Sequence, residues 1–272
     1  MKSILRDSVN WLPHGVRHRI RHIPGIAALQ RWLVNRVLSG EPFVHIINAG
    51  PAAGLRFEVT LPLDKAIWAG TYESDFAGAI SRGVKRGDVC YDIGGYRGYM
   101  SGVMALAGAA KVLVFEPLPS NQHALRRLCD LNPRLTIDLK PVAVGNIDDS
   151  MRLRVMADSS MGKLATSTFQ AEAESKGEIE VAVRCLDSMV QGNEIPPPQV
   201  IKIDVEGAEL DVLRGAAGVL SACHPRIFLE AHSASLEEAC SRELTRHGYD
   251  LRRLESSPGA EEDTRHLIAI AR

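Results

Sequence analysis

The chain has 272 residues, 45% of them hydrophobic, and a net charge of −1 at pH 7. This length suits one large domain or a domain with an extension. The balanced charge argues against nucleic acid as a partner. Its five cysteines form no C-x-x-C pair, which argues against a zinc site and a disulfide framework and favours a cytoplasmic location. No apolar run approaches the roughly 20 residues of a membrane span, and the first residues lack the apolar segment of a signal peptide.

The first 40 residues are basic, with seven Lys and Arg side chains against a single acid. Residues 27–38 have apolar side chains at helical spacing, which predicts a helical lid with a solvated basic face. The alternative is a surface that meets an anionic substrate, a lipid headgroup or a partner, and so a weak membrane-surface contact through residues 1–40. Residues 43–63 alternate apolar and polar side chains and predict a β-hairpin. We therefore expect an N-terminal extension over residues 1–65 and the main domain over residues 66–272.

From residue 88 onward, predicted strands and helices alternate along the chain, which is typical of a mostly parallel sheet with helices on both faces. Residues 151–156 and 179–185 predict an added antiparallel pair, and residues 157–178 predict a loop with a short helix. The last two strands are expected at one edge of the sheet, in antiparallel orientation. The predicted strands are 89–93, 111–116, 136–144, 200–204, 226–230, 249–253 and 266–271, and the predicted helices are 99–106, 120–131, 208–215 and 235–247.

A glycine-rich turn follows the first of these strands, in the segment D-I-G-G-Y-R-G of residues 92–98. Gly94, Gly95 and Gly98 allow the backbone to approach a ligand without a Cβ in the way. The helix that follows presents its unpaired amides to a carboxylate or phosphate group. Asp92 stands just before the turn. An acidic residue, a glycine turn and a helix in this order predict a site for a nucleoside cofactor.

Two cofactors suit this architecture, and the glycine spacing distinguishes them. A nicotinamide dinucleotide needs G-x-G-x-x-G, but Tyr96 and Tyr99 stand where the second and third glycines belong, which disfavours an NAD-dependent oxidoreductase. S-adenosylmethionine has an ammonium group that suits Asp92, and a ribose whose two hydroxyls suit a carboxylate after the second strand. Glu116 stands at that position. The residues therefore favour S-adenosylmethionine as the cofactor.

Longer segments of the chain resemble the FkbM family of S-adenosylmethionine-dependent methyltransferases. The resemblance covers about residues 68–232. The clearest matches are D-I-G-G-Y-R-G-Y-M-S from Asp92, F-E-P-L-P-S-N from Phe115 and I-K-I-D-V-E-G-A-E-L-D-V-L-R-G-A from Ile201. Supporting matches are G-T-Y-E from Gly70, P-V-A-V-G from Pro141 and V-R-C-L-D-S from Val183.

The resemblance implies the α/β, Rossmann-like fold of class I methyltransferases, with a seven-stranded, mostly parallel sheet and helices on both faces, here preceded by the helical and β-hairpin extension. It also implies methyl transfer from S-adenosylmethionine, usually to a hydroxyl oxygen of a sugar or small metabolite. The cofactor contacts that it implies are Asp92, Gly94, Gly95 and Gly98 at the methionine end, Glu116 at the ribose, Val142 and Ala143 near the adenine, and Tyr72 and Glu73 closing over the cofactor.

The glycine turn departs from the family at one place. The family sequence is usually D-I-G-A-N-x-G, whereas this chain has Gly95-Tyr96-Arg97. A tyrosine lacks the paired donor and acceptor of an asparagine amide, so the cofactor contacts differ here. We expect Arg97 to reach an anionic acceptor instead.

Methyl transfer to a hydroxyl needs an aligned acceptor and a group that takes the hydroxyl proton. Asp204, Glu230 and His232 follow the fourth and fifth strands and are the candidate catalytic residues, and Asp204 is also expected at the cofactor. Asp204 or His232 is the expected general base, His232 because its ordinary pKa is about 6.5. Glu206 and Glu209 are expected to orient the acceptor. Asp204, Glu230 and His232 could instead meet at one divalent ion, but the sequence does not show convergence, and we expect no metal.

The leading interpretation is O-methylation of a sugar, glycolipid or secondary metabolite. N-methylation is an alternative, but the fourth strand is not followed by the N/D-P-P-Y type of tetrapeptide. A cofactor-binding or scaffold protein without activity is a second alternative, against which Asp92, Glu116 and Asp204 argue. The acceptor pocket is expected to be built by the first 60 residues and by residues 157–178, because specificity lies in such variable segments.

Overall fold

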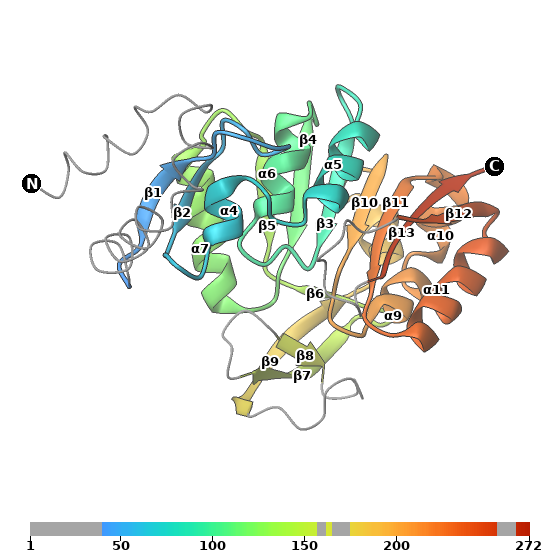
Figure 1. Cartoon of the computed structure of the whole chain (residues 1–272). Coiled ribbons are helices and arrows are strands. Elements are labelled where there is room, and N and C mark those ends of the chain that lie inside the picture. The colour runs from blue at the N-terminus through green and yellow to red at the C-terminus, as the bar shows by residue number, and fades with distance from the viewer. Residues whose placement is uncertain (1–39, 157–161, 165–174, 255–264) are drawn as a thin grey trace, which may run out of the picture.

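The computed structural model describes residues 40–156, 162–164, 175–254 and 265–272, and its centre is a seven-stranded sheet in the order β12-β13-β11-β10-β3-β4-β5 (Figure 1). Strand β13 is antiparallel to both of its neighbours, and the other strands are parallel. This is the class I methyltransferase arrangement that the resemblance implies, so the predicted fold is confirmed. The strands are β3 (Val89–Ile93), β4 (Lys111–Phe115), β5 (Ile137–Lys140), β10 (Val200–Ile203), β11 (Arg226–Ala231), β12 (Tyr249–Arg253) and β13 (Arg265–Ala271).

The last two strands lie at one edge of the sheet and pair in antiparallel orientation, as expected. Strand β13 inserts between β11 and β12 and is antiparallel to both, so β12 runs in the same direction as the parallel strands. One detail of the predicted sheet is wrong. The single strand expected over 136–144 is divided into β5 and β6 (Ala143–Val144), and β6 belongs to another sheet. The division falls at Pro141, which has no N–H to give to a neighbouring strand. Val142 then donates its N–H back to the carbonyl of Lys140 at 2.9 Å.

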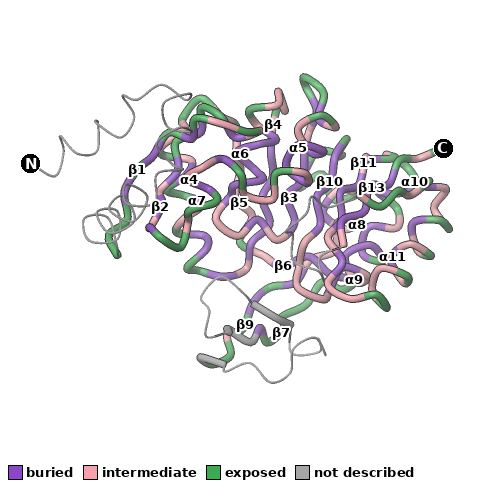
Figure 2. The backbone as a smooth tube through the Cα atoms, viewed as in Figure 1, coloured by how far each residue is buried: buried purple, intermediate pink, exposed green. Residues whose placement is uncertain are grey.

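Helices cover both faces of the main sheet, as expected, because successive strand residues point to opposite faces. Cys90, Val112 and Val114 join one buried core, while Tyr91 and Leu113 join the other. Figure 2 shows these strands buried between the two layers. The first core receives α4 (Lys65–Ala69), α5 (Ser74–Gly83), α6 (Tyr99–Leu106) and α7 (Pro119–Leu131), and the second receives α8 (Leu186–Gln191), α9 (Glu209–Arg214), α10 (Ala217–Cys223) and α11 (Ala234–Arg246).

Four of these helices, α4, α5, α8 and α10, were not predicted from the sequence. Three of them have five to seven residues, and α5 carries two glycines among its ten residues, so their periodic signal is weak. Within the described ranges, no helix combines the length and the apolar character that a membrane span requires.

A β-hairpin precedes the main sheet, as residues 43–63 predict. Strands β1 (Phe43–Ile46) and β2 (Arg56–Val59) pair in antiparallel orientation. Phe43, Phe57 and Val59 point into the first core. Residues 1–39, on which the basic helical lid and the membrane-surface contact were predicted, lie outside the described residues. The division of the chain at residue 65 therefore stays a prediction.

A second sheet projects from the lower edge of the main sheet in Figure 1, in the order β6-β9-β7-β8. Strands β7 (Asp149–Met156) and β9 (Ser175–Arg184) are antiparallel, which confirms the predicted added pair. Residues 162–164 form strand β8 against β7, where a loop with a short helix was expected. The neighbouring residues 157–161 and 165–174 lie outside the described residues.

Candidate functional site

A cavity of about 280 Å³ lies at the carboxyl ends of β3, β4, β10 and β11. This is the edge where parallel α/β sheets bind their ligands. Among the residues predicted from the sequence, those that line the cavity are Tyr72, Glu73, Gly94, Glu116, Ala143, Asp204, Glu206 and Glu230. Those that do not line it are Asp92, Gly95, Arg97, Gly98, Val142, Glu209 and His232.

The glycine turn packs so closely on strand β10 that position 94 has no room for a side chain. Gly94 has a φ of 76°, and a Cβ there would lie 1.7 Å from the carbonyl oxygen of Asp204. Tyr96 adopts a φ of 48°, and its N–H points back to Glu116. The left-handed conformation is sterically costly for a tyrosine. The turn therefore brings backbone, rather than side chains, to the cavity at Gly94.

A buried lysine, Lys202, contacts the backbone of this turn and two acidic side chains beside it. Nζ of Lys202 is 3.2 Å from Oδ1 of Asp92 and 3.2 Å from Oδ2 of Asp204, and it donates to the carbonyl of Gly94 at 2.7 Å. Burial alone would lower the pKa of Lys202, but the two carboxylates outweigh burial and raise it. Asp92 is fully buried and also accepts a hydrogen bond from Ser101. Asp92 thus supports the turn from inside the protein.

Lys202 was not among the residues predicted from the sequence, although the sequence carries a signal for it. It is the only charged residue in a four-residue strand, Val200–Ile203, whose residues are all buried. A charged side chain in such a strand needs a partner of opposite charge. Because the acids Asp92 and Asp204 near the strand ends were predicted, their ion pairs with Lys202 could have been predicted as well.

Glu116 stands at the end of β4 with only 4% of its surface exposed. Its Oε2 accepts the N–H of Tyr96 at 2.9 Å, and its Oε1 accepts the N–H of Leu118 at 2.8 Å. Burial raises the pKa of Glu116 to about 7, against the lowering effect of these two N–H groups. Each carboxylate oxygen has a further lone pair. Glu116 can therefore accept hydrogen bonds from a ligand's hydroxyls while it holds the turn.

His232 lies at the centre of an acidic cluster beside the cavity. Its Nδ1 is 2.7 Å from Oε1 of Glu209, which is fully buried. Its Nε2 is 3.6 Å from Oδ1 of Asp204, 3.6 Å from Oε2 of Glu206 and 3.7 Å from Oε1 of Glu230. Burial would lower the pKa of His232, but the hydrogen bond to Glu209 and the charges of Asp204, Glu206 and Glu209 outweigh burial and raise it to about 9. The ordinary value assumed from the sequence does not hold in this surrounding, and the imidazole carries a proton at neutral pH.

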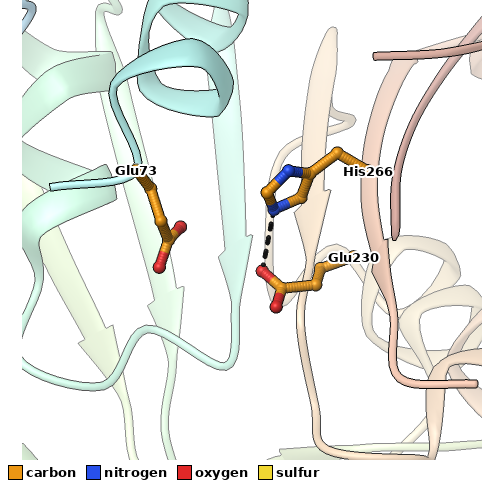
Figure 3. Close-up of side chains that lie close together, drawn as sticks. All are labelled: Glu73, Glu230 and His266. Atoms are coloured by element: carbon orange, nitrogen blue, oxygen red, sulfur yellow. Dashed lines mark hydrogen bonds and ion pairs between the residues drawn. The ribbon is translucent and has the colours of Figure 1, made fainter. Parts of the chain in front are cut away.

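Glu230 also contacts a second histidine, on the neighbouring strand β13. Nε2 of His266 is 3.1 Å from Oε2 of Glu230, and its ring stacks on Phe76 with centroids 4.0 Å apart. Figure 3 shows the Glu73 carboxylate, from the start of α5, facing this pair. Burial and the charges of Glu230 and Asp204 raise the pKa of Glu73 to about 7. No pattern in the sequence indicated His266, because its partner lies 36 residues away on another strand.

Arg97 is engaged away from the cavity. Its Nη1 is 2.7 Å from Oδ1 of Asp64, its Nη2 donates to the carbonyl of Glu58 at 2.6 Å, and its guanidinium lies over the ring of Phe57. These contacts join the glycine turn to the β-hairpin. The structure gives Arg97 a positioning role, and contact with an acceptor stays a prediction.

We expect Arg97→Ala to lower the free energy of unfolding by about 1–3 kcal/mol, because Asp64 and the Glu58 carbonyl lose a part-buried partner. Chemical denaturation measures this loss. Arg127→Ala is the matched control, since Arg127 pairs with Glu58 at the surface and should contribute less than about 1 kcal/mol. Equal stability of Arg97→Ala and the unmodified chain would contradict the positioning role.

Comparisons with known proteins show the family of the chain. Residues 92–259 match the family described as Methyltransferase FkbM domain. The hexuronic acid methyltransferase AglP of Haloferax volcanii is 26% identical over 162 residues, which are 59% of this chain; the chain spans 63% of the length of that relative.

Two solved structures are similar over a larger share of the chain. The methyltransferase FkbM from Methylobacillus flagellatus KT is 20% identical and has a TM-score of 0.49, with 67% of this chain and 43% of that chain covered. The precorrin-6y C5,15-methyltransferase from Geobacter metallireducens GS-15 is 12% identical and has a TM-score of 0.46, with 72% and 89% covered. Because the family match spans well over half of the sequence, this chain belongs to the FkbM methyltransferase domain family.

Proposed function

We propose that this chain is an S-adenosylmethionine-dependent methyltransferase that methylates a hydroxyl oxygen of a sugar, glycolipid or secondary metabolite. The observation that carries the proposal is the position of Glu116: a buried carboxylate at the end of β4, on the wall of the cavity and beside the glycine turn. A ribose presents two adjacent hydroxyl donors, and a carboxylate with two oxygens is the acceptor that suits them.

The residues present suit this cofactor at its other end too. S-adenosylmethionine carries an ammonium and a sulfonium group, and the cavity wall holds the carboxylates of Glu73, Asp204 and Glu230. Gly94 lines the same cavity with backbone alone, because a Cβ there would meet the carbonyl oxygen of Asp204. When bound, the cofactor supplies a methyl group that is already activated. We assign Gly94, Gly95 and Gly98, supported by Asp92, to the methionine end.

We assign the adenine to the neighbourhood of Val142 and Ala143, of which Ala143 lines the cavity. Tyr72 and Glu73 line the same cavity from the segment before α5, and we assign them to the closure over the cofactor.

The acceptor's proton needs a group that is basic at neutral pH. We assign this role to Asp204, because it lines the cavity while the imidazole of His232 already carries a proton. Glu206 also lines the cavity and can accept a hydrogen bond from the acceptor. Glu209 does not line it, so we assign Glu209 to the orientation of His232.

A sugar acceptor is supported by the family and by the name of one relative, which acts on a hexuronic acid. We also propose that the reaction takes place in the cytoplasm, where the five thiols of the chain, none of them in a disulfide, would stay reduced. Membrane contact through residues 1–40 stays a prediction.

The experiment is a transfer assay with S-adenosylmethionine labelled in its methyl group. The acceptors are uronic acids, neutral sugars and, for the alternative of N-methylation, amino sugars and amines. We expect labelled product with at least one hydroxyl acceptor and a large loss of rate in Asp204→Asn. The exposed carboxylate of Glu238 provides the matched control, since Glu238→Gln should keep the full rate. Transfer to amines alone would overturn O-methylation.

A further inference from the structure

Three side chains at the carboxyl ends of β10 and β11 bring their donor atoms toward one point beside the cavity. The donor atoms of Asp204, Glu230 and His232 lie within 4.8 Å of one another. Nε2 of His232 is 3.6 Å from Oδ1 of Asp204 and 3.7 Å from Oε1 of Glu230. These separations exceed those of hydrogen bonds. The three side chains therefore approach one point, but Nε2 of His232 lies beyond hydrogen-bond distance from both carboxylate oxygens.

The separations suit ligands of a shared ion. Two donor atoms that each lie about 2.1 Å from one ion are about 3.0 Å apart at right angles and about 3.4 Å apart at the tetrahedral angle. The observed distances of 3.6 and 3.7 Å exceed the tetrahedral value by about 0.2–0.3 Å and the right-angle value by about 0.6–0.7 Å. Small side-chain rotations would bring all three atoms to one cation.

The imidazole of His232 is oriented from outside this group. Its Nδ1 is 2.7 Å from Glu209, a fully buried carboxylate on α9, and this contact directs Nε2 toward Asp204 and Glu230. Histidines that bind metal ions usually donate their other ring N–H to a carboxylate in this way, because the contact fixes the ring and its tautomer. The buried Glu209 is thus the outer partner that a metal-binding histidine needs.

The carboxylates of Asp204 and Glu230 are each held by a contact with another side chain. In both residues this contact is made by the oxygen that is not the one near His232. Oδ2 of Asp204 is 3.2 Å from the buried Nζ of Lys202, and Oε2 of Glu230 is 3.1 Å from Nε2 of His266 (Figure 3). The other oxygens of the two carboxylates are those near His232. Each of the three candidate ligands therefore has one polar atom anchored and one presented to the same point.

The charge of the cavity wall points to a positive ligand as well. In the part of the chain that the structure describes, no Lys or Arg lines the cavity, whereas five carboxylates do: Glu73, Glu116, Asp204, Glu206 and Glu230. An ammonium group would be satisfied by carboxylates alone. An imidazole fixed by a buried carboxylate is an arrangement that serves a metal ion.

We propose that Oδ1 of Asp204, Oε1 of Glu230 and Nε2 of His232 bind one divalent cation that accepts mixed oxygen and nitrogen ligands, such as Mn²⁺, and that the ion displaces the proton of Nε2 to water as it binds. Oε2 of Glu206, 3.6 Å from the same Nε2, offers a fourth ligand. The use of this ion rests on the proposed methyl transfer: bound to the acceptor hydroxyl, it would lower the pKa of that hydroxyl. Because Oδ1 of Asp204 is then a ligand, water takes the place of Asp204 as the proton acceptor. The hydroxyl proton passes to water, the oxygen bonds to the methyl carbon as the carbon–sulfur bond breaks, and S-adenosylhomocysteine leaves.

The test is a titration of the full chain with Mn²⁺, in which electron paramagnetic resonance measures the free ion. We expect one Mn²⁺ per chain, and about 10-fold or greater loss of affinity in His232→Ala and in Glu230→Gln. Glu209→Gln keeps all three ligands and should lower the affinity about 10-fold through the orientation of His232. Asp211→Asn, at an exposed carboxylate on the same helix, is the control and should bind Mn²⁺ unchanged. Thermal unfolding of every variant without metal verifies that it is folded.

Failure of the unmodified chain to bind Mn²⁺, Mg²⁺ or Zn²⁺ at millimolar concentration would overturn the metal site, as would unchanged binding in both ligand variants. Calorimetry with S-adenosylhomocysteine in the presence of a chelator separates this proposal from the proposed function. Cofactor binding without metal binding overturns the metal site alone, and metal binding without cofactor binding overturns the methyltransferase alone. If no metal binds and the ligand variants lose affinity for S-adenosylhomocysteine, the cluster holds the cofactor's ammonium and the metal site is overturned.

Discussion

Glu116→Gln should lower the affinity of the chain for S-adenosylhomocysteine about 100-fold. In the structure this carboxylate is buried on the cavity wall and holds the N–H groups of Tyr96 and Leu118. Two hydrogen bonds from the ribose hydroxyls to a charged acceptor contribute about 1.5–3 kcal/mol each. A glutamine keeps one acceptor oxygen and replaces the other with a donor, which also opposes one of the two backbone N–H groups. Isothermal titration calorimetry measures the change.

The control for this variant is Glu58→Gln, which makes the same substitution at an exposed carboxylate on β2, outside the cavity. Its affinity for S-adenosylhomocysteine should equal that of the unmodified chain. Because Glu116→Gln also removes support from the glycine turn, its thermal unfolding is measured alongside. A folded Glu116→Gln that binds with full affinity would mean that the ribose lies elsewhere.

Lys202→Met should be the most destabilising single change in the described part of the site, with a loss of about 3–5 kcal/mol in the free energy of unfolding. The ammonium of Lys202 is the buried partner of Asp92 and Asp204, and it holds the carbonyl of Gly94. A methionine fills a similar volume but leaves the fully buried carboxylate of Asp92 without a cation. Chemical denaturation measures the loss.

A second substitution makes this prediction specific. Asp92→Asn removes the carboxylate that Lys202→Met leaves uncompensated, so the double variant should recover part of the stability lost in Lys202→Met. Such non-additivity is expected only for residues that interact directly. Lys111→Met, which breaks an exposed pair with Asp138, is the control and should cost less than about 1 kcal/mol. Additive losses in the double variant would contradict the buried pair.

The sequence was sufficient to predict the parts of the site that depend on neighbours along the chain. The glycine turn and the acids at the strand ends follow from local rules: a strand, a residue with no Cβ where the backbone turns, and a helix. Asp92, Glu116, Asp204 and Glu230 therefore stand at the predicted edge of the sheet. The resemblance to one family added the class I methyltransferase fold with its seven-stranded sheet, which composition and periodicity could not supply.

Contacts between distant segments were not predictable in the same way. Glu209 and His232 are 23 residues apart, and His266 is 36 residues from Glu230, so neither pair leaves a periodic signal. The raised pKa of His232 depends on the contact with Glu209 and on the charges of Asp204 and Glu206, which explains why its ordinary pKa was a poor guide. Arg97 was expected at an acceptor because an arginine on a functional turn suggests an anion. Its pairing with Asp64 depends on how the hairpin folds back.

The most direct test of the whole account is a calorimetric titration of the unmodified chain with S-adenosylhomocysteine, with NAD as the control ligand. We expect micromolar binding of one S-adenosylhomocysteine per chain and no binding of NAD. This result would establish the cavity at Glu116 as a methyltransferase cofactor site. Absence of S-adenosylhomocysteine binding, or binding of NAD in its place, would contradict the proposed function.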